Sequence, residues 1–565
     1  MQSEKIQSID VPPASFQPFE SGNAIGRTLS VVSRSHVNSL AFLILVSLLT
    51  FLPGLSRIPP IDRDEPRYAQ AAKQMMETGN YIDIRYQDQP RYLQPAGAYW
   101  LQVTAAKLTG TAPDAPIWVH RLPSLIAATL AVGLTYWVAI PLVGPIGALI
   151  AALFMASSTL LGFEARLAKT DAILLAASLG AIGVLARAYV GVAISLTAAM
   201  LFWVALAAGI MVKGPLIALI VGSPVVALSI ADRSVRWLRA LRPAYGVCLL
   251  VALVAPWLIA ITVVSESNFW VIAIGKSFLG KVAAGQQGHG APPGFYLLLF
   301  WFTFWPAASL ALIAAPWVWR NRQEPVVRFC LGWIVPTWIV FELVVTKLPH
   351  YVLPLYPAIA ILTARALLAG KLPGRVLQMM MVAGCVVYAI AGVGLMVWIE
   401  GTVSAGAVAL YLAGIALFVA AVRYARDGSA SGLALGMAGG AMLMQISTFG
   451  MIIPQLNNLW LSPRLAAAIE RNASCRDPAV ASAGYHEPSL VFLAGTKTKL
   501  VFANEAADFI AGGGCRVVLV EKPNEQDFMA RLAQINQKAE LRERVTGIKI
   551  GRVSQQDIGI YVPAR

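Results

Sequence analysis

The sequence predicts a polytopic α-helical membrane protein with a small α/β domain at its C-terminal end. Of its 565 residues, 57% are hydrophobic and only 13% are charged, whereas an average soluble domain is about 25% charged. The hydrophobic residues also form blocks close to the roughly 20 residues that a helix needs to cross a bilayer. The last part of the chain is polar instead, and its patterns alternate between strand and helix.

Thirteen apolar blocks are the predicted membrane spans. They cover residues 38–54, 121–143, 145–162, 171–189, 192–211, 214–231, 244–264, 295–318, 327–345, 351–369, 377–399, 404–423 and 431–452. Residues 1–37 are polar and carry no signal-peptide pattern, so we expect a cytoplasmic tail there. Residues 38–454 then form the transmembrane domain.

Basic residues are concentrated in alternate connections between these blocks. Arginines cluster in 232–242 and 320–328, and further basic residues occupy the turns at 371–375 and 423–426. Lys and Arg are enriched on the cytoplasmic side of membrane proteins, so these turns are predicted to lie inside. The net charge of +15 therefore reflects topology, and we expect no nucleic-acid partner. An odd number of spans places the C-terminus outside.

Two outer segments are too long to be simple connections. In the first, residues 55–120, a helix is predicted over 64–77, with Pro66 in its first turn and Gly79 after its end. A second helix is expected over 97–109. The apolar stripe of the first helix is typical of a helix that lies flat at the membrane interface.

The second long outer segment covers residues 455–565. Extended stretches at 499–503, 515–520, 546–550 and 558–562 alternate with a helical stretch at 524–540, which predicts a small α/β domain. Cys475 and Cys515 fall within this segment. They could form a disulfide if the domain faces an oxidising compartment.

Acidic residues follow the first predicted span and open the fourth. Asp64 and Glu65 stand together, with Arg67 one turn after Asp64, and Asp171 begins the block 171–189. A carboxylate at the membrane edge that is held by a cation suits a general base or an electrostatic partner in catalysis. Asp64 and Asp171 could also hold a divalent metal between them. The alternative is that both aspartates only cap helices and that Glu65 is solvated.

Four further polar residues are predicted at the same outer level of the membrane. Lys213 ends one span, and Lys347, His350 and Tyr351 occupy a second junction. Together with Arg67 they place positive charge where it is otherwise sparse, which favours binding of a lipid phosphate. Each lysine alone is also explained by snorkelling to the lipid headgroups.

The outer connection 265–294 is rich in glycine and proline and predicts a flexible cover over this face. His289 lies within it and could polarise a substrate group, although most single loop histidines have no catalytic role.

Five segments in this order resemble the lipid A aminoarabinose transferase family of GT-C membrane glycosyltransferases. They are IDRDEPRYAQAAKQM, RYLQPAGAYW, MVKGPLIAL, SNFW with GQQGHGAPPGFY, and KLPHYVLPLYPAIA. The resemblance implies a bacterial inner-membrane enzyme of the GT-C type with about 13 transmembrane helices and a periplasmic active site. It implies inverting transfer of a sugar from a polyprenyl-phosphate donor to a lipid A, lipopolysaccharide or other glycan acceptor.

The same resemblance assigns roles to single residues. Asp64 and Asp171 match the acids of the family, and Arg67, Lys213 and Tyr351 match positions that hold the carrier phosphate. The sequence departs from the family at Leu93 and Gln94, where the family commonly has Glu and Lys. Gln94 therefore stands at a substrate-binding position with a different side chain, and the aminoarabinose specificity does not transfer.

A transferase of the protein O-mannosyltransferase type, or one that builds another envelope polysaccharide, is the alternative function. A lipid-linked sugar transporter is a third possibility, but transporters usually place their charged residues near the midplane, whereas here they gather at one face. A non-catalytic scaffold would need no matched acids and cations at this depth. No cofactor is identified beyond the possible divalent metal.

Overall fold

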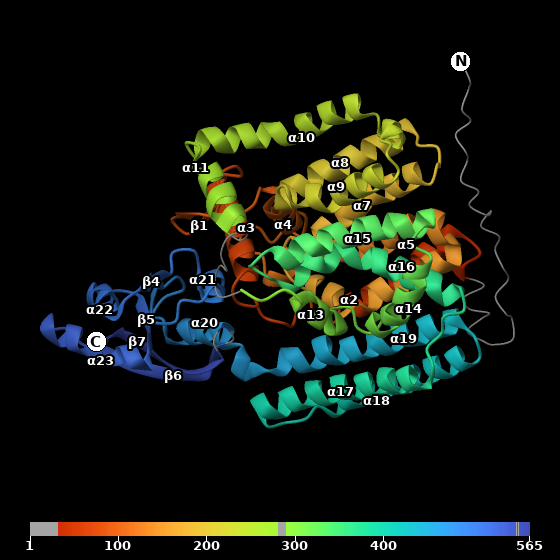
Figure 1. The fold of residues 1–565 in the computed structure, drawn as a ribbon. Helices are drawn as coiled ribbons and strands as arrows, with labels where there is room; N and C mark the ends of the chain where they lie inside the picture. Colours follow the sequence, from red (N-terminus) through yellow and green to blue (C-terminus); the bar gives the residue numbers. More distant parts are fainter. Residues whose placement is uncertain (1–31, 281–289, 550, 552, 565) are drawn as a thin grey trace, which may run out of the picture.

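The computed structural model describes residues 32–280, 290–549, 551 and 553–564. Its main body is a bundle of long apolar helices, and a smaller α/β domain lies at one end of them (Figure 1). The helices of this bundle are α2 (His36–Phe51), α5 (Ile117–Ser157), α7 (Asp171–Tyr189), α8 (Leu196–Lys213), α9 (Leu216–Ala231), α10 (Pro243–Val264), α13 (Phe295–Thr303), α14 (Ala308–Arg320), α15 (Pro325–Leu343), α16 (Tyr356–Leu368), α17 (Arg375–Glu400), α18 (Ala405–Arg426) and α19 (Ala430–Gln445).

Within the described residues, nine helices are long and apolar enough to cross a membrane. Each of the thirteen predicted blocks nevertheless overlaps an apolar helix. Two blocks, 121–143 and 145–162, are the two halves of α5, which breaks at Gly144 because that residue has a φ of 72°. The block 295–318 is divided between α13 and α14, and α2 and α9 are shorter apolar helices. The predicted fold class is therefore confirmed.

The first outer segment contains the two helices that the sequence predicts. Helix α3 covers Glu65–Thr78 and ends at Gly79, whose φ of 71° suits glycine. Helix α4 covers Gly97–Leu108. Between them lies a short antiparallel hairpin of β1 (Arg85–Tyr86) and β2 (Gln89–Pro90), which the sequence analysis did not predict.

The outer connection 265–294 contains helical structure in its described part. Helix α11 covers Asn268–Trp270 and continues as a π-helix over Val271–Leu279. Phe269 is buried against the first outer segment, where its ring contacts Tyr92 with a centroid separation of 6.0 Å. This connection therefore covers part of the first outer segment.

The C-terminal domain is built on a five-stranded sheet in the order β4-β3-β5-β7-β6. Its strands are β3 (Ala479–Ala483), β4 (Lys499–Val501), β5 (Arg516–Glu521), β6 (Ala539–Lys549) and β7 (Ser554–Pro563). Strands β4, β3 and β5 are parallel, and β7 pairs antiparallel with both β5 and β6. Helices α20 (Leu461–Asn472), α21 (Pro488–Ala494), α22 (Ala503–Ala511) and α23 (Glu525–Gln534) complete the domain.

Strand β3 was missed by the sequence analysis because its residues, AVASA, are small and lack the alternation of a half-buried strand. It lies inside the sheet with four of its five residues buried, so no polar face is present in its sequence. The helix predicted over 524–540 is also too long: α23 ends at Gln534, and Asn536 has a φ of 52°.

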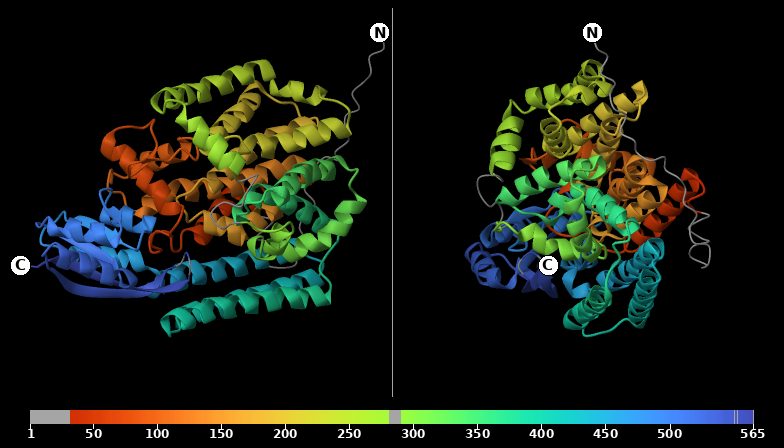
Figure 2. Two further views of the ribbon diagram at one scale, coloured as in Figure 1. Left: turned by 60° about the vertical axis from the view of Figure 1, so that its left-hand side comes forward. Right: turned by 45° about the vertical axis from the view of Figure 1, so that its right-hand side comes forward.

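The C-terminal domain packs against the first outer segment. The Ser489 backbone N–H donates to the Asp62 carboxylate at 3.0 Å, and the Gln70 amide donates to the Thr496 hydroxyl at 2.7 Å. Gln87 donates to the carbonyl of Thr498 at 2.6 Å. The left view of Figure 2 shows the domain beyond one end of the helices. Cys475 and Cys515 form a disulfide within it.

Candidate functional site

Glu65 and Arg121 form a buried ion pair where α3 meets α5. The Arg121 Nε atom lies 2.7 Å from Glu65 Oε1, and neither side chain is more than 1% exposed. Glu65 also accepts hydrogen bonds from the backbone N–H groups of Ile61 and Ala168, at 2.8 and 2.9 Å. Both carboxylate oxygens of Glu65 are therefore occupied by structural partners.

Asp64 precedes α3 and is placed differently. Its side chain does not cap the helix, and among the described residues it makes no side-chain hydrogen bond or ion pair. Arg67, one turn later, is also without a carboxylate partner in the described part of the chain. Asp64 and Arg67 are thus partly buried, oppositely charged side chains that remain available to a ligand.

A second group of charged side chains lies at the N-terminal end of α7. Lys213, from the end of α8, donates a hydrogen bond to Asp171 Oδ1. Lys169 lies 3.6 Å from Asp171 Oδ2 and 3.8 Å from Glu164 Oε1. His350 lies between the two acids, 3.5 Å from Glu164 and 3.6 Å from Asp171. We call these five residues the buried charge cluster.

The buried charge cluster is electrically balanced by its own residues. Its two acids are matched by two lysines, and all five side chains are less than about one-eighth exposed. Burial raises the pKa of Glu164 to about 7, an effect that Lys169 opposes and that the charges of Asp171 and Asp64 reinforce. Asp64 is therefore close enough to act electrostatically on this cluster.

Glu164, Asp171 and His350 could hold a metal ion by distance, because one ligand atom from each lies within 4.8 Å of the others. However, the Lys169 ammonium group already lies near both acids, and that of Lys213 is paired with Asp171. A metal ion would have to displace these cations or be repelled by them. The donor set therefore fits a lysine-neutralised cluster better than a metal centre, and the metal expected between Asp64 and Asp171 stays an untested prediction.

The structure brings most of the predicted site residues to this end of the bundle. Tyr351 lies beside the cluster, with its ring 5.7 Å from the Lys213 Nζ atom. Lys347 does not join it, because its ammonium group donates to the carbonyls of Glu342 and Val344 at the end of α15. His289 lies outside the described residues.

Gln94 contributes to the wall of the site through Tyr68. The Tyr68 hydroxyl donates to the side-chain Oε1 atom of Gln94 at 2.5 Å, and the Tyr68 ring stacks on that of Tyr99 with a centroid separation of 5.2 Å. Gln94 therefore fixes the orientation of an aromatic side chain that is 4% exposed.

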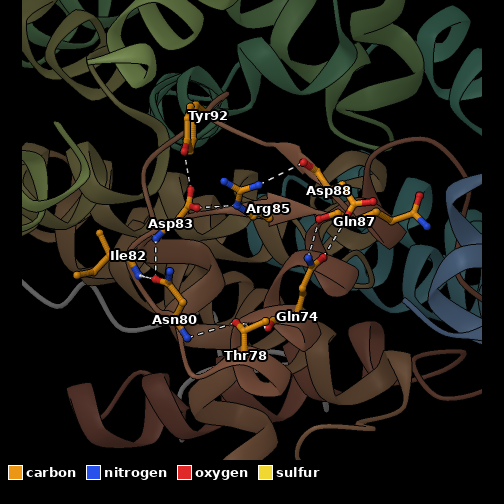
Figure 3. A network of polar contacts seen from close by, with 9 residues as sticks. All are labelled: Gln74, Thr78, Asn80, Ile82, Asp83, Arg85, Gln87, Asp88 and Tyr92. Carbon is orange, nitrogen blue, oxygen red and sulfur yellow. Dashed lines mark hydrogen bonds and ion pairs between the residues drawn. The ribbon is translucent and has the colours of Figure 1, made fainter. Parts of the chain in front are cut away.

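The hairpin beside Gln94 is held by its own polar network (Figure 3). Asp83 accepts from Arg85 at 2.6 Å and from the Tyr92 hydroxyl at 2.5 Å. Gln74 of α3 exchanges two hydrogen bonds with the backbone of Gln87. The loop that carries the site is thus tied to α3 and is not a free connection.

Glu164, Lys169 and Arg91 were not predicted from the sequence as functional candidates. Glu164 and Lys169 stand in the segment EARLAKTD that also contains Asp171. Charged residues at the membrane edge need partners, and this signal could have identified both. Arg91 stands in RYLQPAGAYW, next to the residues that were analysed.

Comparison with solved structures identifies the fold. The chain superposes on the crystal structure of ArnT from Cupriavidus metallidurans bound to undecaprenyl phosphate, with a TM-score of 0.72 and 16% identity. The match covers 93% of this chain and 97% of that one. The fold is that of the GT-C membrane glycosyltransferases. An oligosaccharyltransferase from Archaeoglobus fulgidus matches more distantly, with a TM-score of 0.51 and 12% identity over 90% of this chain and 69% of that one.

Sequence comparisons agree with this fold. Residues 93–259 match the dolichyl-phosphate-mannose-protein mannosyltransferase family. The undecaprenyl phosphate-alpha-4-amino-4-deoxy-L-arabinose arabinosyl transferase of Edwardsiella ictaluri is 27% identical over 58% of this chain and 58% of its own length. That of Pectobacterium atrosepticum is 26% identical over 69% and 71%. The chain thus spans less than two thirds of the length of the first of these relatives. The predicted resemblance to the aminoarabinose transferases is confirmed.

Proposed function

We propose that this chain is an inverting glycosyltransferase that moves a sugar from a polyprenyl-phosphate donor to an envelope acceptor. The observation that carries the proposal is Asp64, an unpaired carboxylate beside the unpaired Arg67 and next to a balanced buried charge cluster, within a GT-C fold. A relative with this fold is described as bound to undecaprenyl phosphate, and relatives in sequence are named as users of an undecaprenyl-phosphate sugar.

In the proposed reaction, a nucleophilic oxygen of the acceptor attacks the anomeric carbon of the sugar. The bond between that carbon and the phosphate oxygen breaks, and polyprenyl phosphate leaves with the bonding electrons. Asp64 orients the acceptor and takes its proton if it is a hydroxyl group, whereas for a phosphate acceptor it acts only through its charge. Arg67 stabilises the charge that develops on the leaving phosphate.

Asp171 supports this site from within the buried charge cluster. Lys213 and Lys169 pair with it, and His350 contacts it from η4 (Pro349–Leu355). We propose that Asp171 and Lys213 act as a pair that fixes the position of α7 against α8. Tyr351, next to Lys213, remains a candidate for contact with the carrier phosphate.

Purified protein in nanodiscs tests the function directly. Incubation with an undecaprenyl-phosphate sugar and an acceptor should release free undecaprenyl phosphate, and Asp64→Asn should reduce that release by orders of magnitude. Asp88→Asn is the matched control, because Asp88 is exposed in the same outer segment. Asp64→Asn turnover equal to that of the wild type would exclude the assignment.

The acceptor class can be separated in the same assay. The resemblance to the lipid A aminoarabinose transferase family favours a lipid acceptor, whereas the family that matches residues 93–259 is described as transferring to protein. Supplying lipid A in one reaction and an envelope protein extract in another, with a radiolabelled sugar, shows which acceptor gains the label. If neither acceptor gains the label and the protein instead moves the intact donor between leaflets, the result would favour the transporter alternative.

We further propose that the protein lies in a bacterial inner membrane with a cytoplasmic N-terminus and a periplasmic site. The Cys475–Cys515 disulfide supports a periplasmic C-terminal domain, because disulfides persist in oxidising compartments. The arginine-rich turns gather away from that domain, where Arg328 pairs with Asp232 and Arg365 pairs with Glu324. A fusion of alkaline phosphatase to the C-terminus should be active. An inactive fusion would contradict the proposed topology and indicate a cytoplasmic C-terminus.

A further inference from the structure

Arg91 is one of three buried arginines among the described residues, and it differs from the other two. Arg121 pairs with Glu65 and donates to three backbone carbonyls. Arg166 donates to the carbonyls of Pro53, Gly162 and Thr50. The Arg91 side chain is 8% exposed, yet its Nε–H group has no acceptor and it has no ion pair in the described part of the chain.

The fold holds the backbone of Arg91 in a fixed position. Its N–H group donates to the Ile84 carbonyl at 2.8 Å, directly after β2. Side chains alternate between the faces of a hairpin, so Arg91 and Tyr86 share one face, while the Asp83 network of Figure 3 occupies the other. The guanidinium group lies over the Tyr68 ring, 4.9 Å from its centroid.

The surroundings of Arg91 keep it charged. Burial opposes the charge, but Tyr99, Tyr68 and Asp64 more than offset this effect and hold the pKa of Arg91 above its ordinary value. Asp64 acts only at a distance, because no oxygen of it lies within ion-pair distance of Arg91 in the structure. A buried guanidinium without a counter-ion is unfavourable, so Arg91 is arranged for an anion that is supplied from outside the chain.

A hydroxyl group near Arg91 also lacks an acceptor. The buried Tyr86 hydroxyl has no hydrogen-bond partner among the described residues, and the buried Tyr99 hydroxyl has only the Arg91 guanidinium group beside it. Burial raises the pKa of Tyr86 to about 12, while the positive charges of Arg67 and Arg91 lower it, which places both guanidinium groups near this hydroxyl. The guanidinium groups of Arg67 and Arg91 and the Tyr86 hydroxyl therefore lie in one neighbourhood, where the Arg91 Nε–H group and the Tyr86 hydroxyl have no acceptor among the described residues.

A phosphate group has the charge and the oxygen geometry for this arrangement, since a guanidinium can donate two parallel hydrogen bonds to it. We propose that Arg91, together with Arg67, binds a phosphate group of a substrate beside Asp64. This inference rests on the proposed function for the identity of the substrate but not for the existence of the anion site. The phosphate can belong to the polyprenyl carrier or to the acceptor.

Binding of undecaprenyl phosphate and of lipid A to the 565-residue chain in nanodiscs tests the inference. Arg91→Gln should weaken the binding of one of the two ligands by about ten- to a hundredfold, the loss expected for hydrogen bonds to a charged group. A loss for undecaprenyl phosphate assigns the site to the carrier, and a loss for lipid A assigns it to the acceptor. Arg57→Gln is the matched control, because Arg57 is exposed in the same outer segment.

Unchanged affinity of Arg91→Gln for both ligands would overturn the inference. If Arg91→Gln does not fold, Arg91→Lys retains the charge but loses the planar fork, and it should bind the assigned ligand several-fold more weakly than the wild type; equal binding would overturn the inference. A wild-type protein that binds phosphate through Arg91 but transfers no sugar would refute the proposed function alone. A wild-type protein that transfers sugar while Arg91→Gln binds normally would refute only this inference.

Discussion

Glu65 shows how a plausible catalytic acid is distinguished from a structural one at the level of a single residue. It stands next to Asp64 in the sequence, and both were candidates for catalysis. In the structure Glu65 accepts four hydrogen bonds, from Arg121 and from two backbone N–H groups. Asp64 accepts none through its side chain among the described residues. We infer that Glu65 joins α3 to α5 and leaves the chemistry to Asp64.

Glu65→Gln is therefore expected to act on stability. It leaves the Arg121 charge buried without its counter-ion, a change that typically costs about 3–5 kcal/mol. Thermal unfolding of the detergent-solubilised protein should show a clear fall in Tm. Glu470→Gln, at an exposed position of α20, should leave Tm unchanged. If Glu65→Gln keeps the wild-type Tm but loses turnover, Glu65 acts in catalysis and not only in stability.

Asp171 and Lys213 allow stability and activity to be separated. Asp171→Asn leaves two buried lysines with less opposing charge and should lower stability by about 3 kcal/mol. The double variant Asp171→Asn/Lys213→Met removes one of these lysines and should recover part of that loss. If the pair only fixes α7 against α8, activity should recover with stability in the double variant. Persistent loss of turnover at recovered Tm would show that one of them contacts substrate.

At the level of elements, the crossing of α4 and α8 sets the distance between the first outer segment and the buried charge cluster. Gly97 begins α4, and a Cβ atom added there would lie 2.6 Å from the backbone carbonyl oxygen of Met211. Met211 is two residues before Lys213 on α8. The absence of a side chain at Gly97 therefore lets the helix that carries Tyr99 approach the helix that carries Lys213.

Gly97→Ala should push these helices apart, because a backbone carbonyl cannot turn aside as a flexible side chain can. We expect a loss of about 1–3 kcal/mol together with weaker donor binding. Gly222→Ala on α9 is the control, since nothing lies within 4 Å of a Cβ atom added there. Equal Tm values and equal donor affinity for the two variants would contradict this role of Gly97.

The elements that could be predicted from sequence are those whose signal is local. Uninterrupted apolar blocks identify the membrane helices, and a proline followed later by a glycine marks the limits of α3. Strand β3 and the hairpin of β1 and β2 were missed because five small residues and two-residue strands carry no periodicity. In the site, the prediction that Asp171 and Lys213 lie at the same level of the bundle came from the order of the spans, and the two side chains are paired in the structure. The pairing of Glu65 with Arg121 and the isolation of Arg91 depend on contacts across the sequence and could not be read from it.

At the level of the whole molecule, the C-terminal domain is attached to the first outer segment through partly buried polar contacts. Asp62 accepts from the Ser489 N–H group, and burial raises its pKa to about 6 from 3.8. An acid whose pKa is higher in the docked state binds protons more tightly there. Docking is therefore favoured at low pH and is weakened as the pH rises from about 4 to about 6.

Asp62→Asn should keep the acceptor for Ser489 but abolish this pH dependence. The measurement is the rate at which a protease cleaves between the bundle and the C-terminal domain at pH values from 4 to 7. Cleavage of the wild type should accelerate through this range, because the free energy of docking falls by at most about 3 kcal/mol. Cleavage of Asp62→Asn should stay constant once both rates are divided by the rate at which the protease cleaves an unstructured substrate at the same pH. Parallel profiles for the two proteins would show that Asp62 does not control docking.

The contacts between the two outer segments also determine at which stage of synthesis the site can be fully assembled. Asp62, Gln70 and Gln87 leave the ribosome early, but their partners Ser489, Thr496 and Thr498 are made more than 400 residues later. Every membrane helix precedes those partners in the chain. A nascent protein can therefore assemble its bundle while the wall of its site still lacks support, and that support arrives only when the final segment has been translated and folded.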